Sequence, residues 1–231
     1  MFFETKLIRM SDIHETVIIV AGGKGERMQT EIPKQFIEIN SKPILMHTIG
    51  VFVKYNNKID VIVVLPETQF DNWRELCKKH AFEIKHRVVR GGLTRFDSVK
   101  NGLAHAENEG LIAVHDGVRP LVSIRTIQLC FDEAKCSGTA IPVVEAVESL
   151  RQIDENKSFS VDRTKFKMVQ TPQVFDAKIL KDAYTQEYSP LFTDDASVVE
   201  SSGIKINLVE GNCENIKITT PFDLKMVEML L

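Results

Sequence analysis

The sequence contains few cysteines, and their spacing excludes the sites that cysteines usually build. There are four in 231 residues, and no two of them form a Cys-x-x-Cys pair. A disulfide framework or a four-ligand zinc site would need such pairs. We therefore expect free thiols in a reducing, cytoplasmic compartment, at Cys77, Cys130, Cys136 and Cys213.

A strong charge bias and a long apolar run are lacking as well. The formal net charge is −3, so no global attraction to nucleic acid or to anionic membranes is expected. Residues 1–15 carry acidic side chains and no long apolar run, so they predict a short extension rather than a signal peptide or membrane span. The hydrophobic share of 43% is enough for a sizeable core, and without internal repeats we expect one domain over residues 1–231.

The two commonest nucleotide-binding motifs are also absent. In the stretch 23–28, Met28 stands where the dinucleotide fingerprint requires its third glycine. No Gly-Lys-Ser/Thr sequence follows at the spacing of a P-loop. What remains near the start of the chain is a glycine-rich loop of another kind.

That loop has the features of a polyphosphate site. Residues 17–20 are apolar and mostly β-branched, which predicts a buried strand. Three glycines follow in four positions, and glycine lets a ligand approach the main chain closely. Successive backbone N–H groups in such a loop bind anions. Three cations stand in or just after the loop, Lys24, Arg27 and Lys34. A simple turn is the alternative interpretation.

Strands and helices then alternate along the chain. Apolar runs predict strands at 61–65, 87–89, 111–114, 139–144 and 205–209. Helical spacing and capping residues predict helices at 44–55 and 70–80, one through Val99 to Ala106, and others that begin at Ser123, within 193–196 and at Thr220. This order predicts an α/β fold with a mostly parallel sheet and helices on both faces. Ligands should gather where the strands' carboxyl ends meet.

Two later loops are candidates for the same site. Gly92 and Ser98 lie in a second glycine turn after a strand, which could form another wall of the nucleotide site. Asp116 follows directly after the predicted strand at 111–114 and His115. It could cap the turn or pair with Arg119, or it could bind Mg²⁺, because this ion prefers one or two carboxylates together with substrate phosphates.

Residues 145–170 differ from the rest in having short alternating segments. Residues 150–153 and 159–161 flank a polar turn, which predicts a hairpin that stands off the main sheet. An isolated hairpin is marginally stable in water, so we expect it to pack on a partner.

The motif Ala-Gly-Gly-x-Gly-x-Arg-Met, followed by Pro-Lys-Gln-Phe, resembles the signature of cytidylyltransferases that make CDP-linked polyols. The resemblance covers residues 16–231. It implies a Rossmann-like fold, transfer of CMP from CTP to a polyol phosphate with release of pyrophosphate, and Mg²⁺ as the cation. It also implies a homodimer in which a protruding β-arm, residues 145–170, is exchanged.

The resemblance further implies the roles of individual residues. Arg27 and Lys34 would stabilise the transition state at the α-phosphate. The nucleotide would contact Ala21, Gly22, Gly23, Lys24, Gly25, Gly92, Ser98 and Asp116, with Mg²⁺ bound through Asp116. The acceptor would contact Arg119, Arg163, Thr171 and Lys217, with Arg163 acting in trans.

Several alternatives stay open. The resemblance favours 2-C-methyl-D-erythritol 4-phosphate, of the non-mevalonate isoprenoid pathway, as acceptor. However, Glu145-Ala146 stands where family members usually have Asp-Thr, and Ala146 cannot form a side-chain hydrogen bond, so ribitol 5-phosphate is the alternative. An NAD-dependent oxidoreductase would need the fingerprint that Met28 breaks. An inactive nucleotide-binding module would be expected to have lost Arg27, Lys34 or Asp116, and all three are present.

Overall fold

The structure is a computed structural model that describes residues 13–23, 32–155 and 157–231. Most of the expected N-terminal extension therefore lies outside the described residues, as do Lys24, Gly25 and Arg27. No helix among the described residues is both long enough and apolar enough to cross a membrane.

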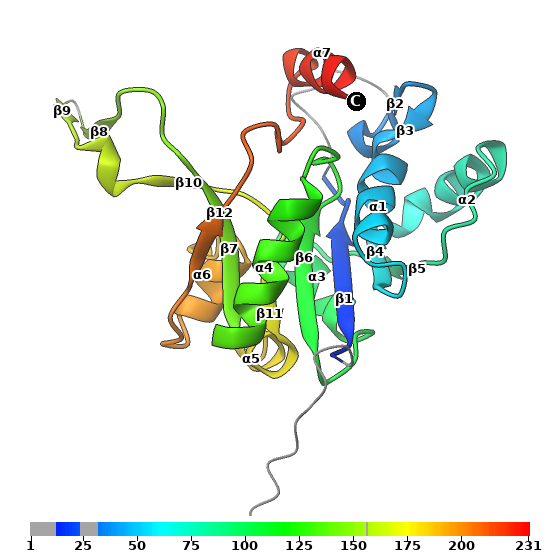
Figure 1. Cartoon of the computed structure of the whole chain (residues 1–231), viewed down its shortest axis with the longest axis horizontal. Helices are drawn as coiled ribbons and strands as arrows, with labels where there is room; N and C mark the ends of the chain where they lie inside the picture. Colours follow the sequence, from blue (N-terminus) through cyan, green and yellow to red (C-terminus); the bar gives the residue numbers. More distant parts are fainter. Residues whose placement is uncertain (1–12, 24–31, 156) are drawn as a thin grey trace, which may run out of the picture.

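A central sheet of eight strands organises the chain (Figure 1). β1 (Glu15–Val20) lies between β6 (Leu111–Asp116) and β4 (Asp60–Leu65) and is parallel to both. β5 (Arg87–Arg90) adds a parallel edge strand beside β4. These parallel strands confirm the α/β fold, and they bring the carboxyl ends of β1, β4, β5 and β6 to one edge of the sheet.

The sheet is buried on both faces, as continuous apolar strands require. In β1, the side chains of Val17 and Ile19 enter one core cluster, and Ile18 enters the other. One face is covered by α1 (Ile44–Tyr55), α2 (Phe70–Lys79) and α4 (Ile124–Ser137). The other face is covered by α3 (Arg95–Leu103), α5 (Ala177–Ala183) and α6 (Asp195–Glu200). α7 (Pro221–Leu230) packs in a smaller third cluster.

Several short elements complete the body. They are η2 (Lys34–Phe36), β2 (Glu38–Ile39), β3 (Lys42–Pro43) and η3 (Glu67–Gln69). The predicted caps are also formed. The side chain of Ser123 accepts a hydrogen bond from the backbone N–H of Thr126 at the start of α4. Thr220 forms a capping box with Asp223, and Pro221 is the first residue of α7.

The second half of the sheet is mixed. β11 (Gln173–Asp176) lies antiparallel between β6 and β7 (Thr139–Glu145), and β10 (Lys167–Val169) is also antiparallel to β7. The predicted strand at 205–209 was wrong in its bounds, because the strand beside β7 is β12 (Leu208–Glu210). Before β12, the hydroxyl group of Thr139 donates to the carbonyl of Lys205 and accepts from the backbone N–H of Asn207, so a side chain replaces ladder bonds there. The predicted helix end at Ala106 was also late, since α3 ends at Leu103.

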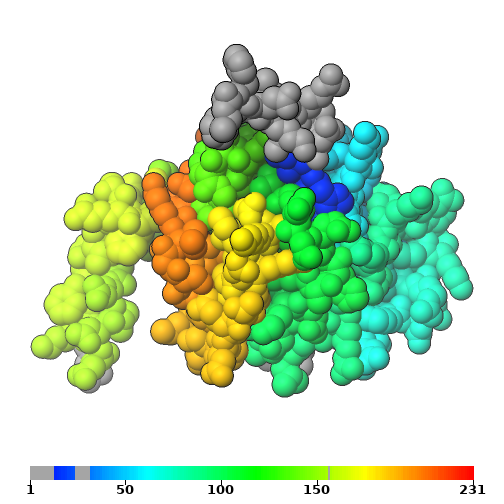
Figure 2. All heavy atoms as spheres, turned by 90° about the horizontal axis from the view of Figure 1, so that it is seen from below, coloured from blue at the N-terminus to red at the C-terminus, as the bar shows by residue number. Residues whose placement is uncertain are grey.

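The predicted hairpin is formed by β8 (Arg151–Asp154) and β9 (Lys157–Ser160). These strands pair only with each other among the described residues, and all eight positions are exposed. Figures 1 and 2 show the hairpin beside the body, beyond the segment that carries β12. Its side chains include the exposed apolar groups of Ile153 and Phe159. The hairpin therefore has no apolar partner within the described part of the chain.

Gly102 lets α3 lie close against the sheet, and this contact gives a testable prediction. A Cβ atom at Gly102 would lie 2.7 Å from Cγ2 of Ile18 and 3.2 Å from Cγ2 of Val64. Both are short, buried, β-branched side chains that cannot move aside. Although alanine is the better helix former, we expect Gly102→Ala to lower the free energy of unfolding by about 1–2 kcal/mol, measured by urea denaturation.

The matched control is Gly50→Ala in α1, where nothing lies within 4 Å of the added Cβ atom. This substitution should raise the free energy of unfolding by about 0.5–1 kcal/mol. Equal effects of the two substitutions would show that the contact with Ile18 does not limit the packing of α3.

Candidate active site

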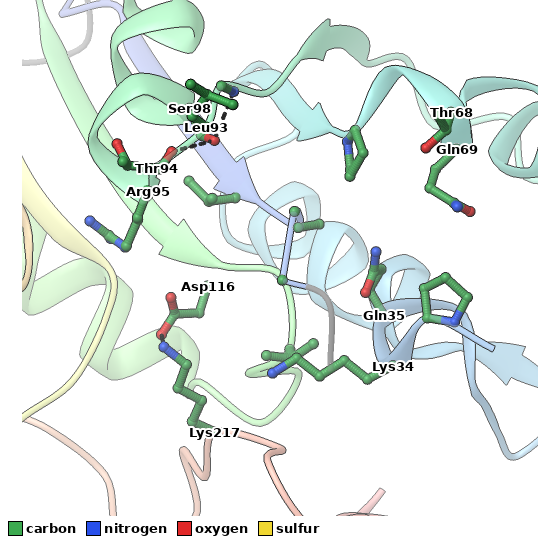
Figure 3. A pocket seen from close by; sticks show the side chains of 18 residues that line it. Lys34, Gln35, Thr68, Gln69, Leu93, Thr94, Arg95, Ser98, Asp116 and Lys217 are labelled. Carbon is green, nitrogen blue, oxygen red and sulfur yellow. Dashed lines mark hydrogen bonds and ion pairs between the residues drawn. The ribbon is translucent and has the colours of Figure 1, made fainter. Parts of the chain in front are cut away.

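A cleft of about 760 Å³ lies at the carboxyl edge of the sheet (Figure 3). It is lined by the residues that follow β1, by the η2 turn, by the loop after β4, by the loop before α3, by the end of β6 and by Lys217. A cavity of this size is typical of small-molecule sites. We call it the larger cleft, and it lies where the parallel sheet predicts ligand binding.

The glycine loop forms one wall of the larger cleft. Ala21, Gly22 and Gly23 line it, and so does Lys34. A Cβ atom at Gly23 would lie 3.5 Å from Cε of Lys34, so the bare main chain runs beside the lysine stem. The structure therefore brings the described part of the glycine loop and Lys34 together. The proposed roles of Lys24, Gly25 and Arg27 stay predictions, because these residues lie outside the described part.

The loop before α3 and the first turn of that helix form another wall, with Gly92 in the loop and Ser98 in the helix. The Oγ atom of Ser98 accepts a hydrogen bond from the backbone N–H of Gly92 at 3.1 Å and donates one to the carbonyl of Thr94 at 2.9 Å. A Cβ atom at Gly92 would lie 2.2 Å from Cβ of Asp97, so only glycine fits. Thr94 caps α3 through a capping box with Asp97. These two hydrogen bonds of Ser98 thus stabilise the conformation of the loop.

Asp116, at the end of β6, is the meeting point of several cations. Its Oδ2 atom accepts from Nε of Arg119 at 2.9 Å and pairs with Nζ of Lys217 at 3.1 Å. Burial by itself would raise the pKa of Asp116, but the charges of Lys217, Arg95 and Arg119 outweigh it and hold the pKa well below its usual range. The carboxylate is therefore ionised at neutral pH. The pairing with Arg119 that the sequence allowed is formed.

His115 and Thr171 fix the backbone at Asp116. The hydroxyl oxygen of Thr171 accepts from the backbone N–H of Asp116 at 3.1 Å, and it lies 3.0 Å from Nδ1 of His115. Nε2 of His115 lies 3.1 Å from the carbonyl oxygen of Arg119. Burial lowers the pKa of His115 to about 4, so the ring is neutral. The network assigns the Nε2–H tautomer, in which Thr171 donates to Nδ1. Thr171 was predicted to contact the acceptor. In the structure its hydroxyl group instead positions the backbone of Asp116.

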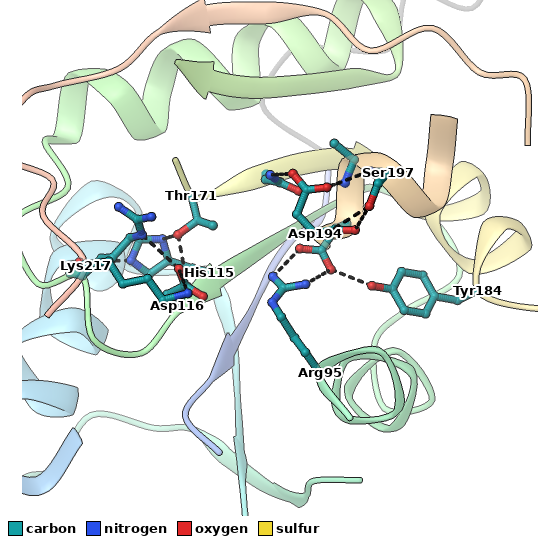
Figure 4. A network of polar contacts seen from close by, with 12 residues as sticks. Arg95, His115, Asp116, Thr171, Tyr184, Asp194, Ser197 and Lys217 are labelled. Carbon is teal, nitrogen blue, oxygen red and sulfur yellow. Dashed lines mark hydrogen bonds and ion pairs between the residues drawn. The ribbon is translucent and has the colours of Figure 1, made fainter. Parts of the chain in front are cut away.

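An ion pair between Arg95 and Asp195 joins α3 to α6 (Figure 4). Two nitrogens of Arg95 donate to the two carboxylate oxygens of Asp195, at 2.9 and 2.5 Å, and the hydroxyl group of Tyr184 donates to Asp195 at 2.6 Å. The carboxylate of Asp195 is fully buried. Asp194 caps α6, within the segment 193–196 where a helix was expected to start, and Asp195 in the first turn forms this buried pair. No pattern in the sequence indicated this pair, whose residues are 100 positions apart.

A smaller cleft of about 300 Å³ adjoins the larger one. Arg95, Asp116 and Lys217 line both clefts. Arg119 and Thr171 line the smaller cleft only. Of the predicted acceptor residues, the structure therefore brings three to one place, namely Arg119, Thr171 and Lys217. A group bound in the smaller cleft would meet a group bound in the larger cleft at Asp116.

Arg163 does not line either cleft within this chain. It lies on the short helix η4 (Arg163–Lys165), after the hairpin, where it is exposed and donates a hydrogen bond to the carbonyl of Val147. Ala146 is buried but does not line either cleft.

The donor atoms at the site fit a magnesium ion that is bound mainly by substrate. No group of three or more His, Cys, Asp or Glu side chains that could hold a metal exists among the described residues. The larger cleft contains a single described carboxylate, that of Asp116. Mg²⁺ usually binds through one or two carboxylates together with phosphate oxygens, so Asp116 suits this ion if a triphosphate completes the coordination.

Sequence reasoning missed several lining residues. Thr68 and Gln69 line the larger cleft just after β4, and Gln35 lines it from η2. Thr68 and Gln69 could have been found from their position, because they follow the carboxyl end of a parallel strand as Gly22 does. Gln35 could not have been found in this way, because it does not follow a strand and its burial depends on how η2 packs.

Comparison with known proteins agrees with this geometry. The sequence model of the family described as 2-C-methyl-D-erythritol 4-phosphate cytidylyltransferase (IspD) matches residues 15–231. Two proteins with this name are similar to the chain. That of Bacteroides fragilis is 56% identical, over 94% of this chain and 99% of its own length. That of Bacteroides thetaiotaomicron is 54% identical, with the same shares covered.

Solved structures give the same result. The enzyme of this name from Francisella tularensis has a TM-score of 0.79 and 32% identity, over 94% of this chain and all of that chain. A 4-diphosphocytidyl-2C-methyl-D-erythritol synthase has a TM-score of 0.78 and 29% identity, over 94% and 99%. Because the family model and relatives above 50% identity both cover nearly all of this sequence, the chain belongs to the 2-C-methyl-D-erythritol 4-phosphate cytidylyltransferase family.

Proposed function

We propose that this chain transfers CMP from CTP to 2-C-methyl-D-erythritol 4-phosphate, which gives 4-diphosphocytidyl-2-C-methyl-D-erythritol and pyrophosphate. This reaction is a step in making isoprenoid precursors by the non-mevalonate pathway. The observation that carries the proposal is the junction of the two clefts at Asp116, because it lets two phosphorylated substrates meet. The larger cleft would hold CTP, and the smaller cleft would hold the acceptor. We also expect the enzyme to work in the cytoplasm.

The reaction needs no nucleophile from the protein. A phosphate oxygen of the acceptor attacks the α-phosphorus of CTP, a new P–O bond forms, and the bond to the leaving pyrophosphate breaks. Two unit charges about 4 Å apart interact by roughly 4 kcal/mol at an effective dielectric of 20, so two phosphates repel strongly. The protein's work is therefore positioning and charge stabilisation. We assign the charge stabilisation at the α-phosphate to Lys34 and Arg27, with Lys24 on the triphosphate.

Magnesium would contribute at the triphosphate. We infer that Asp116 holds the ion together with phosphate oxygens, and that the ion neutralises part of their charge. Lys217 and Arg119 share Oδ2 of Asp116, so these cations are fixed close to the junction. Their positions suit contacts to the acceptor phosphate.

The acceptor can be tested directly. We expect pyrophosphate release from CTP and Mg²⁺ with 2-C-methyl-D-erythritol 4-phosphate, and little or none with ribitol 5-phosphate offered in parallel. Activity with the first acceptor would show that Ala146 is tolerated in this reaction. Release with ribitol 5-phosphate alone would keep the chemistry and contradict the proposed acceptor.

Lys34 should be required for the chemical step. We expect Lys34→Ala to lower kcat by about 10²–10³-fold, by analogy with loss of one preorganised donor to a developing anion. The control is Lys42→Ala, at an exposed position of β3, which should leave kcat unchanged. A folded Lys34→Ala enzyme with near-normal kcat would remove Lys34 from the mechanism.

We further propose that the protein is a homodimer in which the hairpin region lies against a second copy. Exposed apolar side chains gather on the hairpin and on the last part of the arm, at Ile153, Phe159, Phe166, Met168 and Val169. Arg163 lies in this region, away from the clefts of its own chain. Exchange of the arm would bring Arg163 to the acceptor site of the second copy.

A mixing experiment tests this arrangement. Lys34→Ala and Arg163→Ala should each be nearly inactive alone. In a heterodimer of the two variants, one of the two sites would combine an intact Lys34 with an intact Arg163. After subunit exchange at equal concentrations we expect about one quarter of wild-type activity, since half of the dimers are mixed and one site in two is intact. No recovery, despite mixed dimers in native mass spectrometry, would place Arg163 in its own chain's site or outside the mechanism.

A further inference from the structure

Gln35 is buried in the wall of the larger cleft. It lies in the middle of η2, its side chain is part of the lining, and the residue is only 2% exposed. The next residue, Phe36, anchors the turn, because its ring stacks on Trp73 with centroids 5.9 Å apart. The backbone N–H of Phe36 also donates to the carbonyl of Pro33 at 2.8 Å. The position of Gln35 is therefore set by the core and by the turn.

The side-chain oxygen of Gln35 is unpaired. Among the described residues, only two buried side-chain nitrogen or oxygen atoms have no hydrogen-bond partner, Oε1 of Gln35 and Oδ1 of Asn215. Asn215 does not line either cleft, and its amide nitrogen donates to the carbonyl of Thr171 at 2.8 Å. Buried polar groups are nearly always hydrogen-bonded, and an unpaired one is destabilising. Because Gln35 also lines the larger cleft, a group bound there is the candidate partner of this oxygen.

The chemistry of that partner is limited. Oε1 accepts hydrogen bonds and cannot donate them, so the partner must carry an O–H or N–H group. Triphosphate oxygens are acceptors. The donors of CTP are its two ribose hydroxyl groups and the amino group of its base. Figure 3 shows Gln35 beside Lys34, on one side of the cleft, and Thr94 and Ser98 on the other side. The phosphates are proposed to bind at Lys34, next to Gln35. The ribose is attached to these phosphates, whereas the amino group lies at the far end of the base, so the sugar hydroxyl groups are the donors nearest to Gln35.

We propose that Oε1 of Gln35 accepts a hydrogen bond from a ribose hydroxyl group of CTP, which makes Gln35 a nucleotide-binding residue that recognises the sugar. This inference rests on the proposed function, because it takes the larger cleft as the CTP site. In the ligand-free protein, the unpaired oxygen of Gln35 lowers the stability of the fold. Binding of the ribose removes that instability.

Gln35→Met tests the proposal, since methionine has nearly the same shape and no carboxamide. The melting temperature would be measured with and without CTP and Mg²⁺, and kcat/KM would be measured with CTP, 2′-deoxy-CTP and 3′-deoxy-CTP. We expect the ligand-free variant to melt at or above the wild-type temperature, and its CTP-induced shift to shrink. We expect kcat/KM for CTP to fall about tenfold, with no change for the analogue that lacks the recognised hydroxyl group.

Gln69→Met is the matched control. Gln69 lines the same cleft, but its Oε1 atom already accepts from Nδ2 of Asn72 at 3.2 Å. The ratio of kcat/KM for CTP to that for each deoxy analogue should therefore stay at the wild-type value in this variant. A change in that ratio equal to the one in Gln35→Met would overturn the assignment to Gln35.

The other outcomes are also decisive. A lower melting temperature of ligand-free Gln35→Met would show that the oxygen has a partner in the protein, and would overturn the proposal. So would an equal loss of kcat/KM for CTP and both deoxy analogues. UTP lacks the amino group of the cytosine base. If Gln35→Met loses only its preference for CTP over UTP, the donor is that amino group, and the ribose assignment is overturned. If CTP does not shift the melting temperature of the wild type, the proposed function itself fails.

Discussion

The ionised carboxylate of Asp116 is the feature on which the arrangement of the site depends. A buried carboxylate is strongly destabilising unless opposite charges and hydrogen bonds compensate it. Here Arg119 and Lys217 both reach Oδ2, and Arg95 adds its charge from α3. One carboxylate thus holds cations from three separate parts of the chain at the edge of the sheet. Without it, these like charges would repel one another where the two clefts meet.

The fold makes this cluster possible through the direction of its strands. β1, β4 and β6 are parallel, so the loops that follow them meet at one edge. The antiparallel strand β11 then returns along β6, which brings Thr171 beside His115 and the backbone of Asp116. The neutral ring of His115 accepts from Thr171 and donates to the carbonyl of Arg119. A core hydrogen-bond chain thereby fixes the turn that carries both Asp116 and Arg119.

The features that could be predicted from the sequence are those that depend on residues close together in the chain. The apolar run before Gly22, the glycines themselves and the caps at Ser123 and Thr220 depend on neighbouring residues, and each is present as expected. The helix and strand pattern fixes the sheet, and with it the edge where the site lies. The pair of Arg95 with Asp195, the actual bounds of β12 and the burial of Gln35 depend on contacts between distant segments. No periodicity or spacing within one segment carries that information.

The charge balance of the smaller cleft supports the proposal that a second copy of the chain completes the proposed acceptor site. Arg95, Arg119 and Lys217 are its described cations. They face the carboxylates of Asp116 and Asp194 in the lining, and that of Asp195 behind Arg95, so three positive charges are matched by three negative ones. A cleft without net positive charge gives an incoming phosphate dianion little attraction. Arg163 is exposed on the arm, and the hairpin of that arm pairs with no other strand among the described residues. Its delivery from a neighbouring subunit would give the acceptor site the positive charge that one chain does not supply, and it would make assembly of the dimer a condition for catalysis.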